Sequence, residues 1–509
     1  MEGGFSCSSI IAFKDQKNYP PMNHHTDKNL LGILRKPAIA LLALLLALPL
    51  VAGPNEEKIL LVSVNDMHAT FDRLPKLKHL VDSLKNLCPN VLVLSAGDNR
   101  TGNPFNDQYP VSSLPMTELM NYAGFDASAV GNHDFDAKTS GLIEMINHSH
   151  FPYLAANVEL PDSLKGRLQG YKIFTTSGGV RIGVLSLLQL NRNGIPDTHP
   201  KNVEGVRFYP IRETIERHRF LRKECDIVIL LTHLGLAVDQ QLAEEYADFA
   251  DIIVGGHSHT KIEGGLTRNG VLITQAENKL KYATVTTIET NGKAIVGKRA
   301  ELVDLKAMPS DKSAEALVKY FSDNDELNQV IGQLADSIRD VETMGGLMGQ
   351  SWIGETQADV AVINNGNVRI PELPAGDIHL ADVFRIDPYD NDVILLELTG
   401  EELKALLLAC QRADEAKFPF LIGAKYEAKV NPKDSTQIER LTLKHMDGKK
   451  FDMKKSYKVV TSSYVMSISK FNYKKKKEVL DVKCNALMVR YIRRGRNISQ
   501  PKICNVLVR

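Results

Sequence analysis

The sequence predicts an α/β protein built from two domains. Short apolar runs at residues 59–64, 91–94 and 227–231 have the length and composition of buried strands. They alternate with stretches of helical spacing at residues 74–87, 114–123 and 211–223, and this alternation is typical of α/β sandwiches. With 509 residues, the chain is long enough for two ordinary domains and their connections.

The composition is that of a globular protein with no strong overall charge. Apolar residues make up 43% and charged residues 24% of the chain, and the formal net charge is +1. A balance so near zero gives no indication of bulk electrostatic binding to nucleic acid or to a membrane surface. We therefore expect no nucleic-acid partner, and the sequence does not predict an oligomeric state.

The first 53 residues resemble an export signal and are excluded from the fold. Lys28, Arg35 and Lys36 precede an apolar run at 37–52, and Gly53 follows it, as at a signal cleavage site. The run is shorter than the roughly 20 apolar residues that span a membrane. Met22 is an alternative translation start. The prediction is an exported protein, periplasmic or extracellular, with no stable membrane anchor.

The cysteines do not form a metal-binding pattern. Removing the signal region leaves five cysteines, none of them in C-x-x-C spacing. A disulfide between Cys484 and Cys504 and a set of buried free thiols are both compatible with an oxidising compartment.

Residues able to bind a metal follow five of the apolar runs. Because the carboxyl ends of parallel strands meet at one edge of a sheet, these side chains should converge. The residues concerned are Asp66, His68, Asp98, Asn132, His233, His257 and His259.

The order D-x-H, G-D, G-N-H-D, T-H and G-H-S-H resembles that of the calcineurin-like metallophosphoesterases. The spellings G-N-H-D-F-D, T-H-L-G and G-G-H-S-H-T resemble the 5'-nucleotidase branch, which includes UDP-sugar hydrolases. The resemblance implies a four-layer αββα metallophosphoesterase sandwich at 54–305 and an α+β substrate domain at 341–509. A linker helix is expected at 306–340.

The resemblance also implies two divalent metal ions. Asp66, His68, Asp98 and His259 would hold one ion, and Asp98, Asn132, His233 and His257 the other. A carboxylate such as Asp98 can bridge two cations because it has two oxygens and a full charge. Mixed nitrogen and oxygen ligation suits Zn, Mn, Co or Fe better than Ca.

His133 has no metal to bind in this scheme. By resemblance it stabilises the transition state and assists the leaving oxygen, and Asp136, three residues on, orients it. Asp134 is the alternative orienting residue, although a hydrogen bond within the loop is the simpler expectation for it.

The second domain carries a weaker resemblance to the family's substrate loops. Asn364 and Arg369 match a segment in which Asn contacts the nucleoside and Arg binds phosphate. Asn367 stands where the family has Gly, and residues 341–345 lack a second phosphate-binding Arg. Tyr389 matches an aromatic ring that stacks on the base, with Phe471 as its partner, although the usual Gly-rich turn before that partner is absent.

These observations predict dimetal-dependent hydrolysis of nucleotide phosphate esters, with nucleoside 5'-monophosphates as the first substrate class. The alternatives are UDP-sugars, cyclic nucleotides or other phosphoesters. A protein that binds nucleotides without turnover is a further alternative.

Overall fold

The structure is a computed structural model of the 509-residue chain. It describes residues 56–164, 166–413, 417–431, 434–475, 477–495, 497–499 and 506–508. Within these residues the chain divides into two compact units, with the division between Asp323 and Asn324. The predicted signal region at 1–53 and Cys504 lie outside the described residues.

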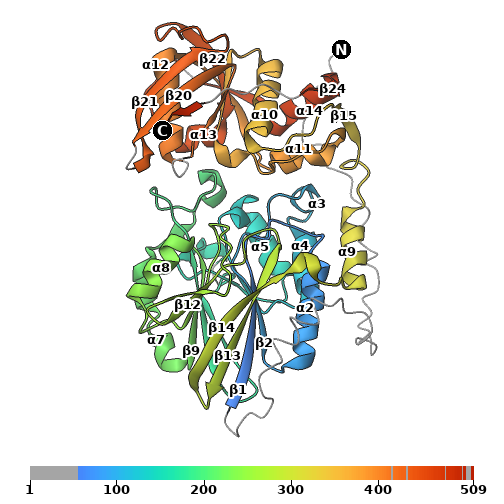
Figure 1. The fold of residues 1–509 in the computed structure, drawn as a ribbon, viewed down its shortest axis with the longest axis vertical. Helices are drawn as coiled ribbons and strands as arrows, with labels where there is room; N and C mark the ends of the chain where they lie inside the picture. The colour runs from blue at the N-terminus through green and yellow to red at the C-terminus, as the bar shows by residue number, and fades with distance from the viewer. Residues whose placement is uncertain are drawn as a thin grey trace. The chain divides into compact units, whose positions relative to one another are not determined.

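The first unit contains two six-stranded sheets, drawn as arrows in Figure 1. The first sheet has the order β14 (Ala294–Asp304), β13 (Tyr282–Asn291), β1 (Glu56–Val64), β2 (Val91–Ser95), β3 (Ala127–Ala129), β4 (Tyr153–Leu154). The second has the order β11 (Leu266–Arg268), β12 (Val271–Thr274), β10 (Ile252–Val254), β9 (Ile227–His233), β7 (Arg181–Leu188), β6 (Tyr171–Thr175). A short pair, β5 (Val158–Glu159) and β8 (Arg207–Phe208), lies apart from both.

Helices cover the outer faces of the two sheets. Figure 1 shows α2 (Leu74–Leu87) and α4 (Leu114–Ala123) beside the first sheet, and α7 (Phe220–Glu224) and α8 (Leu236–Glu245) beside the second. The remaining helices of the unit are α3 (Pro104–Asp107), α5 (Lys138–His148), α6 (Ile211–Arg217) and α9 (Lys312–Ser322). The predicted four-layer αββα sandwich is therefore confirmed.

The core between the sheets explains why these segments form strands. Ile59 and Leu61 of β1 pack in one buried cluster with Ile229 and Leu231 of β9. Alternate residues of the same strands face the outer helices, so each strand is apolar on both sides. The sheets are thus held by apolar contacts on both faces, and their loops can carry polar residues.

Parallel pairing brings the functional loops to one edge of each sheet. Strands β1, β2, β3 and β4 run parallel, as do β7, β9, β10 and β12. The loops that follow β1, β2, β3, β9 and β10 therefore leave their sheets at the carboxyl ends, the edge where open α/β sheets hold ligands.

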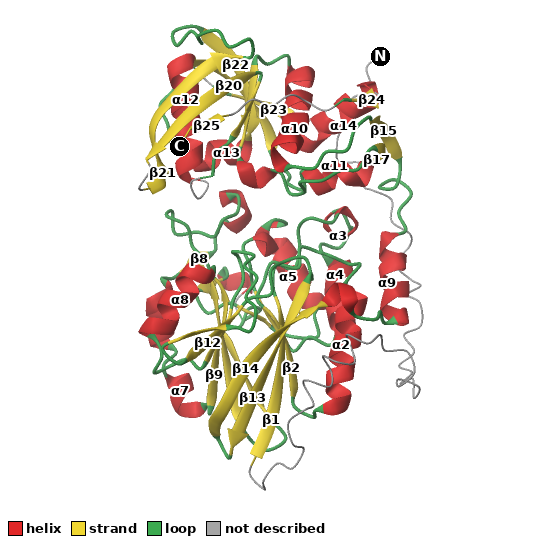
Figure 2. Cartoon of the chain, viewed as in Figure 1, coloured by secondary structure: helices red, strands yellow, loops and turns green. Residues whose placement is uncertain are grey.

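The second unit is built around a five-stranded sheet (Figure 2). Its order is β19 (Phe420–Ile422), β16 (Val360–Ile363), β22 (Ser456–Ser462), β18 (Asp392–Thr399), β23 (Glu478–Lys483). Two three-stranded sheets accompany it: β17 (Gly376–His379), β15 (Val330–Leu334), β24 (Asn497–Ile498); and β21 (Asp434–His445), β20 (Ala424–Asn431), β25 (Val506–Val508). The helices are α10 (Val341–Thr356), α11 (Leu380–Ile386), α12 (Gly400–Ala413), α13 (Ser463–Ile468) and α14 (Cys484–Gly495).

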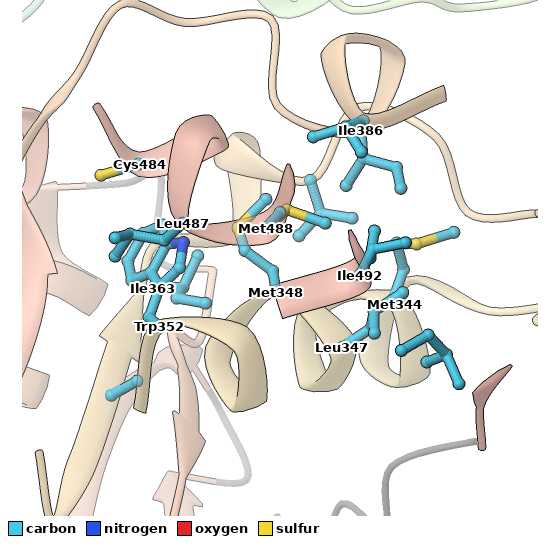
Figure 3. Packing of buried hydrophobic residues seen from close by; sticks show 14 of the residues in the cluster. Met344, Leu347, Met348, Trp352, Ile363, Ile386, Cys484, Leu487, Met488 and Ile492 are labelled. Carbon is cyan, nitrogen blue, oxygen red and sulfur yellow. The ribbon is translucent and has the colours of Figure 1, made fainter. Parts of the chain in front are cut away.

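Two apolar cores lie on the two faces of this sheet. Figure 3 shows one of them, in which Met344, Met348 and Trp352 of α10 pack with Leu487 and Met488 of α14. The other core joins α12 to β20 and β21. Thr399 caps α12, because its hydroxyl accepts from Glu402 N while the Glu402 carboxylate accepts from Thr399 N.

Two expected helices differ from the structure, and a third helix lies where the sequence does not predict one. Helix α9 covers Lys312–Ser322 only, and the second half of the expected linker helix contains strand β15. Residues Asn324–Gln329 turn instead, with the Asn324 side chain accepting from Leu327 N. The stretch 211–223 is broken into α6 and α7 at His218–Arg219. Helix α10 fills residues 341–356, where the Gly-rich composition gave no helix signal.

In the part of the chain that the structure describes, none of the helices has the length and apolar character needed to cross a membrane.

Candidate metal centre and substrate loops

Three of the predicted metal ligands meet after β1 and β10. The His259 Nε2 atom lies 3.2 Å from Asp66 Oδ1 and 3.3 Å from His68 Nε2. Asp66 and His68 are buried, and His259 is half-buried at the rim. The three side chains thus present a carboxylate and two imidazoles to one point, a set able to hold a divalent ion.

A second group forms around His233 at the end of β9. Its Nε2 atom lies 3.3 Å from Asp98 Oδ2 and 3.2 Å from Asn132 Oδ1. His257 Nδ1 is 3.0 Å from the same Asn132 oxygen. The structure therefore brings together all seven predicted ligands in two adjoining groups.

Asp66 contributes to both groups. Asp66 Oδ1 lies 3.9 Å from His233 Nε2, and Asp66, Asp98 and His233 could themselves hold a cation. The assignment of Asp98 as the bridge remains a prediction, and Asp66 is a second carboxylate placed between the groups.

The loops that carry these ligands adopt a backbone that L-residues seldom use. Five of the seven ligands have positive φ, between 48° and 75°: Asp66, His68, Asp98, His257 and His259. Such conformations cost energy and persist where the surroundings impose them, often at functional sites. The ligand loops are thus held in a shape that local sequence preference opposes.

Charge within the centre is unbalanced without a cation. Burial raises the pKa of Asp98, but His233 and His133 outweigh it and hold the pKa well below its ordinary value. Burial opposes charge on His233, yet Asp98 and Asp66 raise its pKa to about 10. Two buried carboxylates thus draw a proton onto a buried imidazole. A divalent cation fits the same site, because it would supply that positive charge and displace the proton.

Asp134 joins the ligand loops after β2 and β3 by hydrogen bonds. Its carboxylate accepts hydrogen bonds from Gly131 N (2.8 Å), Asn99 N (3.0 Å) and Asp98 N (3.2 Å). Burial and the nearby Asp98 raise its pKa to about 7. This is the loop hydrogen bonding expected for Asp134. Gly131 permits the close approach, since an added Cβ would lie 2.1 Å from Asp98 Oδ1.

His133 contacts Asp136 rather than Asp134. Its Nδ1 atom lies 2.7 Å from Asp136 Oδ2, and Asp136 Oδ1 accepts from the Thr198 hydroxyl at 3.1 Å. The His133 ring stands edge-on to His68, with centroids 5.3 Å apart. The pair therefore borders the metal ligands, with Nδ1 held by a carboxylate.

Several supporting residues lack any sequence signal. Asn65 donates to Asp66 Oδ2 (2.6 Å) and accepts from Ala276 N (2.7 Å). Gln275 donates to Gly256 O, and its carbonyl accepts from Ser258 and Thr260. Asp197 O accepts from Asn132 Nδ2 at 3.0 Å. Only the folded contacts show that these amides hold the ligand loops, because Asn and Gln are common in any surface loop.

The predicted substrate loop follows β16 in the second unit. Asn364 is only 2% exposed, and its Oδ1 has no hydrogen-bond partner among the described residues. Arg369 is half-buried, with its N–H bonded to Ile386 O. Asn367 needs no left-handed backbone, since it closes the short 3-10 turn Asn365–Asn367. The Tyr389 hydroxyl donates to Gly366 O at 3.5 Å, so this ring lies against the same loop.

Phe471 lines an open pocket together with Tyr473, a residue that the sequence did not indicate. Its ring stacks on Tyr473, with centroids 5.0 Å apart and planes at 29°. Both rings line a cavity of about 450 Å³ together with Lys470, Asn472 and Lys477. Tyr473 therefore covers one side of the Phe471 ring.

Cys484 is a buried thiol in the second unit, 3.6 Å from Asp392 O. Its proposed disulfide partner, Cys504, lies outside the described residues.

Comparisons with known proteins identify the same two domains. Residues 59–261 match the model of the calcineurin-like phosphoesterases, and residues 323–474 match that of the 5'-nucleotidase C-terminal domain. Protein 5NUC of Lutzomyia longipalpis is 28% identical, over 81% of this chain and 86% of that protein. Endonuclease YhcR of Bacillus subtilis is 27% identical over 67% of this chain, which spans only 30% of that longer protein.

A solved structure shows the same fold across both units. The 5'-nucleotidase precursor of Thermus thermophilus superposes with a TM-score of 0.76 at 20% identity, covering 89% of this chain and 99% of that one. The two family models together account for both units, in the order in which the sequence carries their motifs. The chain belongs to the calcineurin-like phosphoesterases that carry a 5'-nucleotidase C-terminal domain.

Proposed function

We propose that this protein is a dimetal phosphohydrolase that removes phosphate from nucleoside 5'-monophosphates. Family membership supports hydrolysis of nucleotide phosphate esters. The convergence of Asp66, His68, Asp98, Asn132, His233, His257 and His259 beside the His133–Asp136 pair is the observation that carries the proposal.

Two divalent ions bound here would neutralise the phosphate oxygens and activate a water molecule for attack. We assign the first ion to Asp66, His68, Asp98 and His259, and the second to Asp98, Asn132, His233 and His257. The nitrogen and oxygen donors favour Zn, Mn, Co or Fe.

His133 supplies the acid–base chemistry of this chain. Because Asp136 holds Nδ1 at 2.7 Å, Nε2 is the ring nitrogen that we assign to the substrate. A proton on Nε2 can stabilise charge on the phosphate and then pass to the departing oxygen. Thr198 fixes the other Asp136 oxygen, which keeps the imidazole in one orientation.

The second unit would select the substrate. Arg369 is the residue that we assign to a substrate phosphate, and Tyr389 and Phe471 are assigned to the base. We place the domain boundaries at residues 54–305 and 341–509, with 306–340 as the connection. The apolar run at 37–52 supports export of the protein to the periplasm or the medium.

A broader phosphoester hydrolase is the second candidate. Asn364 is almost fully buried, which disfavours direct contact with a nucleoside. Residues 341–345, where the family has a second Arg, begin helix α10 and contain no Arg. Both observations argue against strong selectivity for nucleotides over other phosphate esters.

Rates of product formation separate these candidates: phosphate from AMP and from nitrophenyl phosphate, and UMP with glucose 1-phosphate from UDP-glucose. AMP, UDP-glucose and nitrophenyl phosphate should be compared on the metal-loaded protein. A kcat/KM for AMP well above the other two supports the nucleotidase. Faster UDP-glucose cleavage favours a nucleotide-sugar hydrolase, equal rates favour the broader enzyme, and no turnover of any of them contradicts the proposal.

A further inference from the structure

His259 differs from His68 and His233 in what holds its second ring nitrogen. Its Nε2 faces Asp66 and His68, so Nε2 is the atom offered to a metal. Its Nδ1 lies 3.0 Å from the side-chain amide nitrogen of Asn278. The Asn278 Oδ1 atom is buried and has no hydrogen-bond partner in the described part of the chain.

His68 and His233 show the arrangement that metal binding requires. In both, Nδ1 meets a backbone carbonyl oxygen, Thr101 O at 3.0 Å for His68 and Ala96 O at 2.7 Å for His233. A carbonyl only accepts, so Nδ1 carries a hydrogen and Nε2 is the nitrogen left to offer its lone pair to a metal. A metal-ligating imidazole usually donates its other N–H to such an acceptor.

The Asn278 amide presents a hydrogen-bond donor to His259 Nδ1, whereas His68 and His233 have an acceptor there. An NH₂ group donates, so it places the lone pair of His259 on Nδ1 and the hydrogen on Nε2, where the metal would bind. A half-turn of the amide about its terminal bond exchanges the two groups. Oδ1 would then accept from Nδ1–H, which gives the presently unpartnered oxygen a hydrogen bond and frees the Nε2 lone pair.

The loop around Asn278 has an unusual backbone conformation and is hydrogen-bonded to neighbouring loops. Glu277, Lys279 and Leu280 all have positive φ, of 62°, 51° and 50°. Hydrogen bonds tie the loop to two ligand loops: Glu277 O accepts from Asn65, Lys279 N donates to Asp66 O, and Glu277 N donates to Thr260 O. These hydrogen bonds hold the strained loop, so that Asn278 lies beside His259.

We propose that Asn278 is a positioning residue for the metal ligand His259. With a metal bound, Asn278 Oδ1 accepts from Nδ1–H of His259 and fixes the tautomer that presents Nε2 to the ion. This inference rests on the proposed metal centre, and it adds to that centre an orienting side chain outside the recognised motifs.

The test compares Asn278→Ala with Asn278→Asp in the full-length protein. Zn²⁺ affinity, measured by competition with a chelator, should fall about 10–100-fold in Asn278→Ala, the range for loss of such orienting partners. Asn278→Asp should restore most of the affinity, because a carboxylate oxygen also accepts from Nδ1–H. Thermal unfolding of the metal-free proteins should be compared in parallel, to measure loop disruption separately.

Nitrogen-15 NMR of the zinc-loaded protein gives a second readout. The Nδ1–H signal of His259, assigned by its loss in His259→Gln, should exchange faster with solvent in Asn278→Ala than in the parent. Asn147→Ala is the matched control, since Asn147 is an exposed amide on α5 and should leave the affinity unchanged.

Unchanged zinc affinity in Asn278→Ala would overturn the inference. Equal weakening in the Ala and Asp variants, with equal loss of metal-free stability, would also overturn it, since that result indicates packing alone. Failure of the metal centre itself is distinguishable, because then the parent protein would bind no zinc and Asp66→Asn would change nothing.

Discussion

The two units hold their buried polar groups in different ways. In the first, each of the seven predicted ligand side chains lies within hydrogen-bonding distance of another, and buried amides and Asp134 hold the loops. In the second, Asn364 Oδ1 and Asp387 Oδ2 are buried with no partner among the described residues. Among the predicted site residues themselves, those of the first unit contact one another, whereas Asn364 in the second has a buried oxygen with no partner among the described residues.

This difference indicates that catalysis and substrate selectivity should be separable by substitutions in the two units. We expect the arrangement of ligands in the first unit to act on any phosphate ester that reaches it. The second has loops that depart from the family pattern at residues 341–345, 367 and 467–471. Substitutions in the first unit should therefore affect every substrate, and those in the second should discriminate between substrates.

The largest effect should come from Asp98→Asn. An amide cannot supply the full charge that a shared carboxylate gives two cations, so metal content should fall and turnover should be abolished. Elemental analysis and phosphate release from AMP and nitrophenyl phosphate measure both. Circular dichroism should show a folded chain. An active variant with two equivalents of metal would remove Asp98 from the bridging position, and Asp66 would then be tested in the same way.

His133→Ala should keep its metals and lose about 10²–10⁴-fold in kcat, the usual contribution of a positioned acid–base group. The loss should be smaller for nitrophenyl phosphate than for AMP, because a good leaving group needs less assistance. Asp136→Asn is the matched variant and should show the same trend more weakly. Equal losses for both esters would argue against a role at the leaving oxygen.

The sequence could predict some residues of the first unit's site but not others. Asp66, Asp98 and His233 follow apolar strands directly, so the rule for parallel sheets is enough to predict that they lie together. Asn65, Gln275 and Asn278 could not be found in this way. Their contacts join separate loops, in one case more than 200 residues apart in the sequence, and an amide side chain has no spacing that marks it.

Helix α10 shows a similar limit in the fold. Gly345 and Gly349 lower its intrinsic helix propensity, so local preference argued against a helix. The folded contacts supply the reason for both glycines. An added Cβ would lie 2.8 Å from the Phe420 ring at Gly345 and 2.6 Å from Ile422 at Gly349, so the helix packs closely on β19. Tertiary packing overrides propensity here, as it does where β15 replaces the expected helix.

A third prediction concerns the buried carboxyl of Asp387. Burial raises its pKa to about 7 in the folded protein, above the ordinary value of 3.8. The folded state therefore retains a proton that the unfolded state loses between these values, and stability falls as pH rises from about 4 to 7. The full effect is on the order of 4 kcal/mol.

Asp387→Asn should remove this dependence. Thermal unfolding of the parent at pH 5 and pH 8 should show a larger loss of stability at pH 8 than the variant shows. Asp377→Asn, at an exposed carboxyl, is the control and should follow the parent. A variant with the parent's pH dependence would show that Asp387 does not titrate in this range.

The smallest effect should come from Tyr389, whose ring lies beside the loop of Asn364 and Arg369. If it stacks on a base, Tyr389→Ala should weaken nucleotide binding by about 1–3 kcal/mol, the range for base–aromatic stacking. Tyr389→Phe should be nearly silent, because the ring makes the contact and its hydroxyl bond to Gly366 O is long at 3.5 Å. KM values for AMP and UMP measure the effect.

Nitrophenyl phosphate sharpens this last test. It has no base, so Tyr389→Ala should leave its kcat/KM unchanged, whereas Arg369→Ala should weaken every ester whose phosphate Arg369 contacts. A KM for AMP and UMP that does not change in Tyr389→Ala would contradict base stacking. The second unit would then recognise something other than a base, and the broader phosphoester hydrolase would become the better account of the molecule.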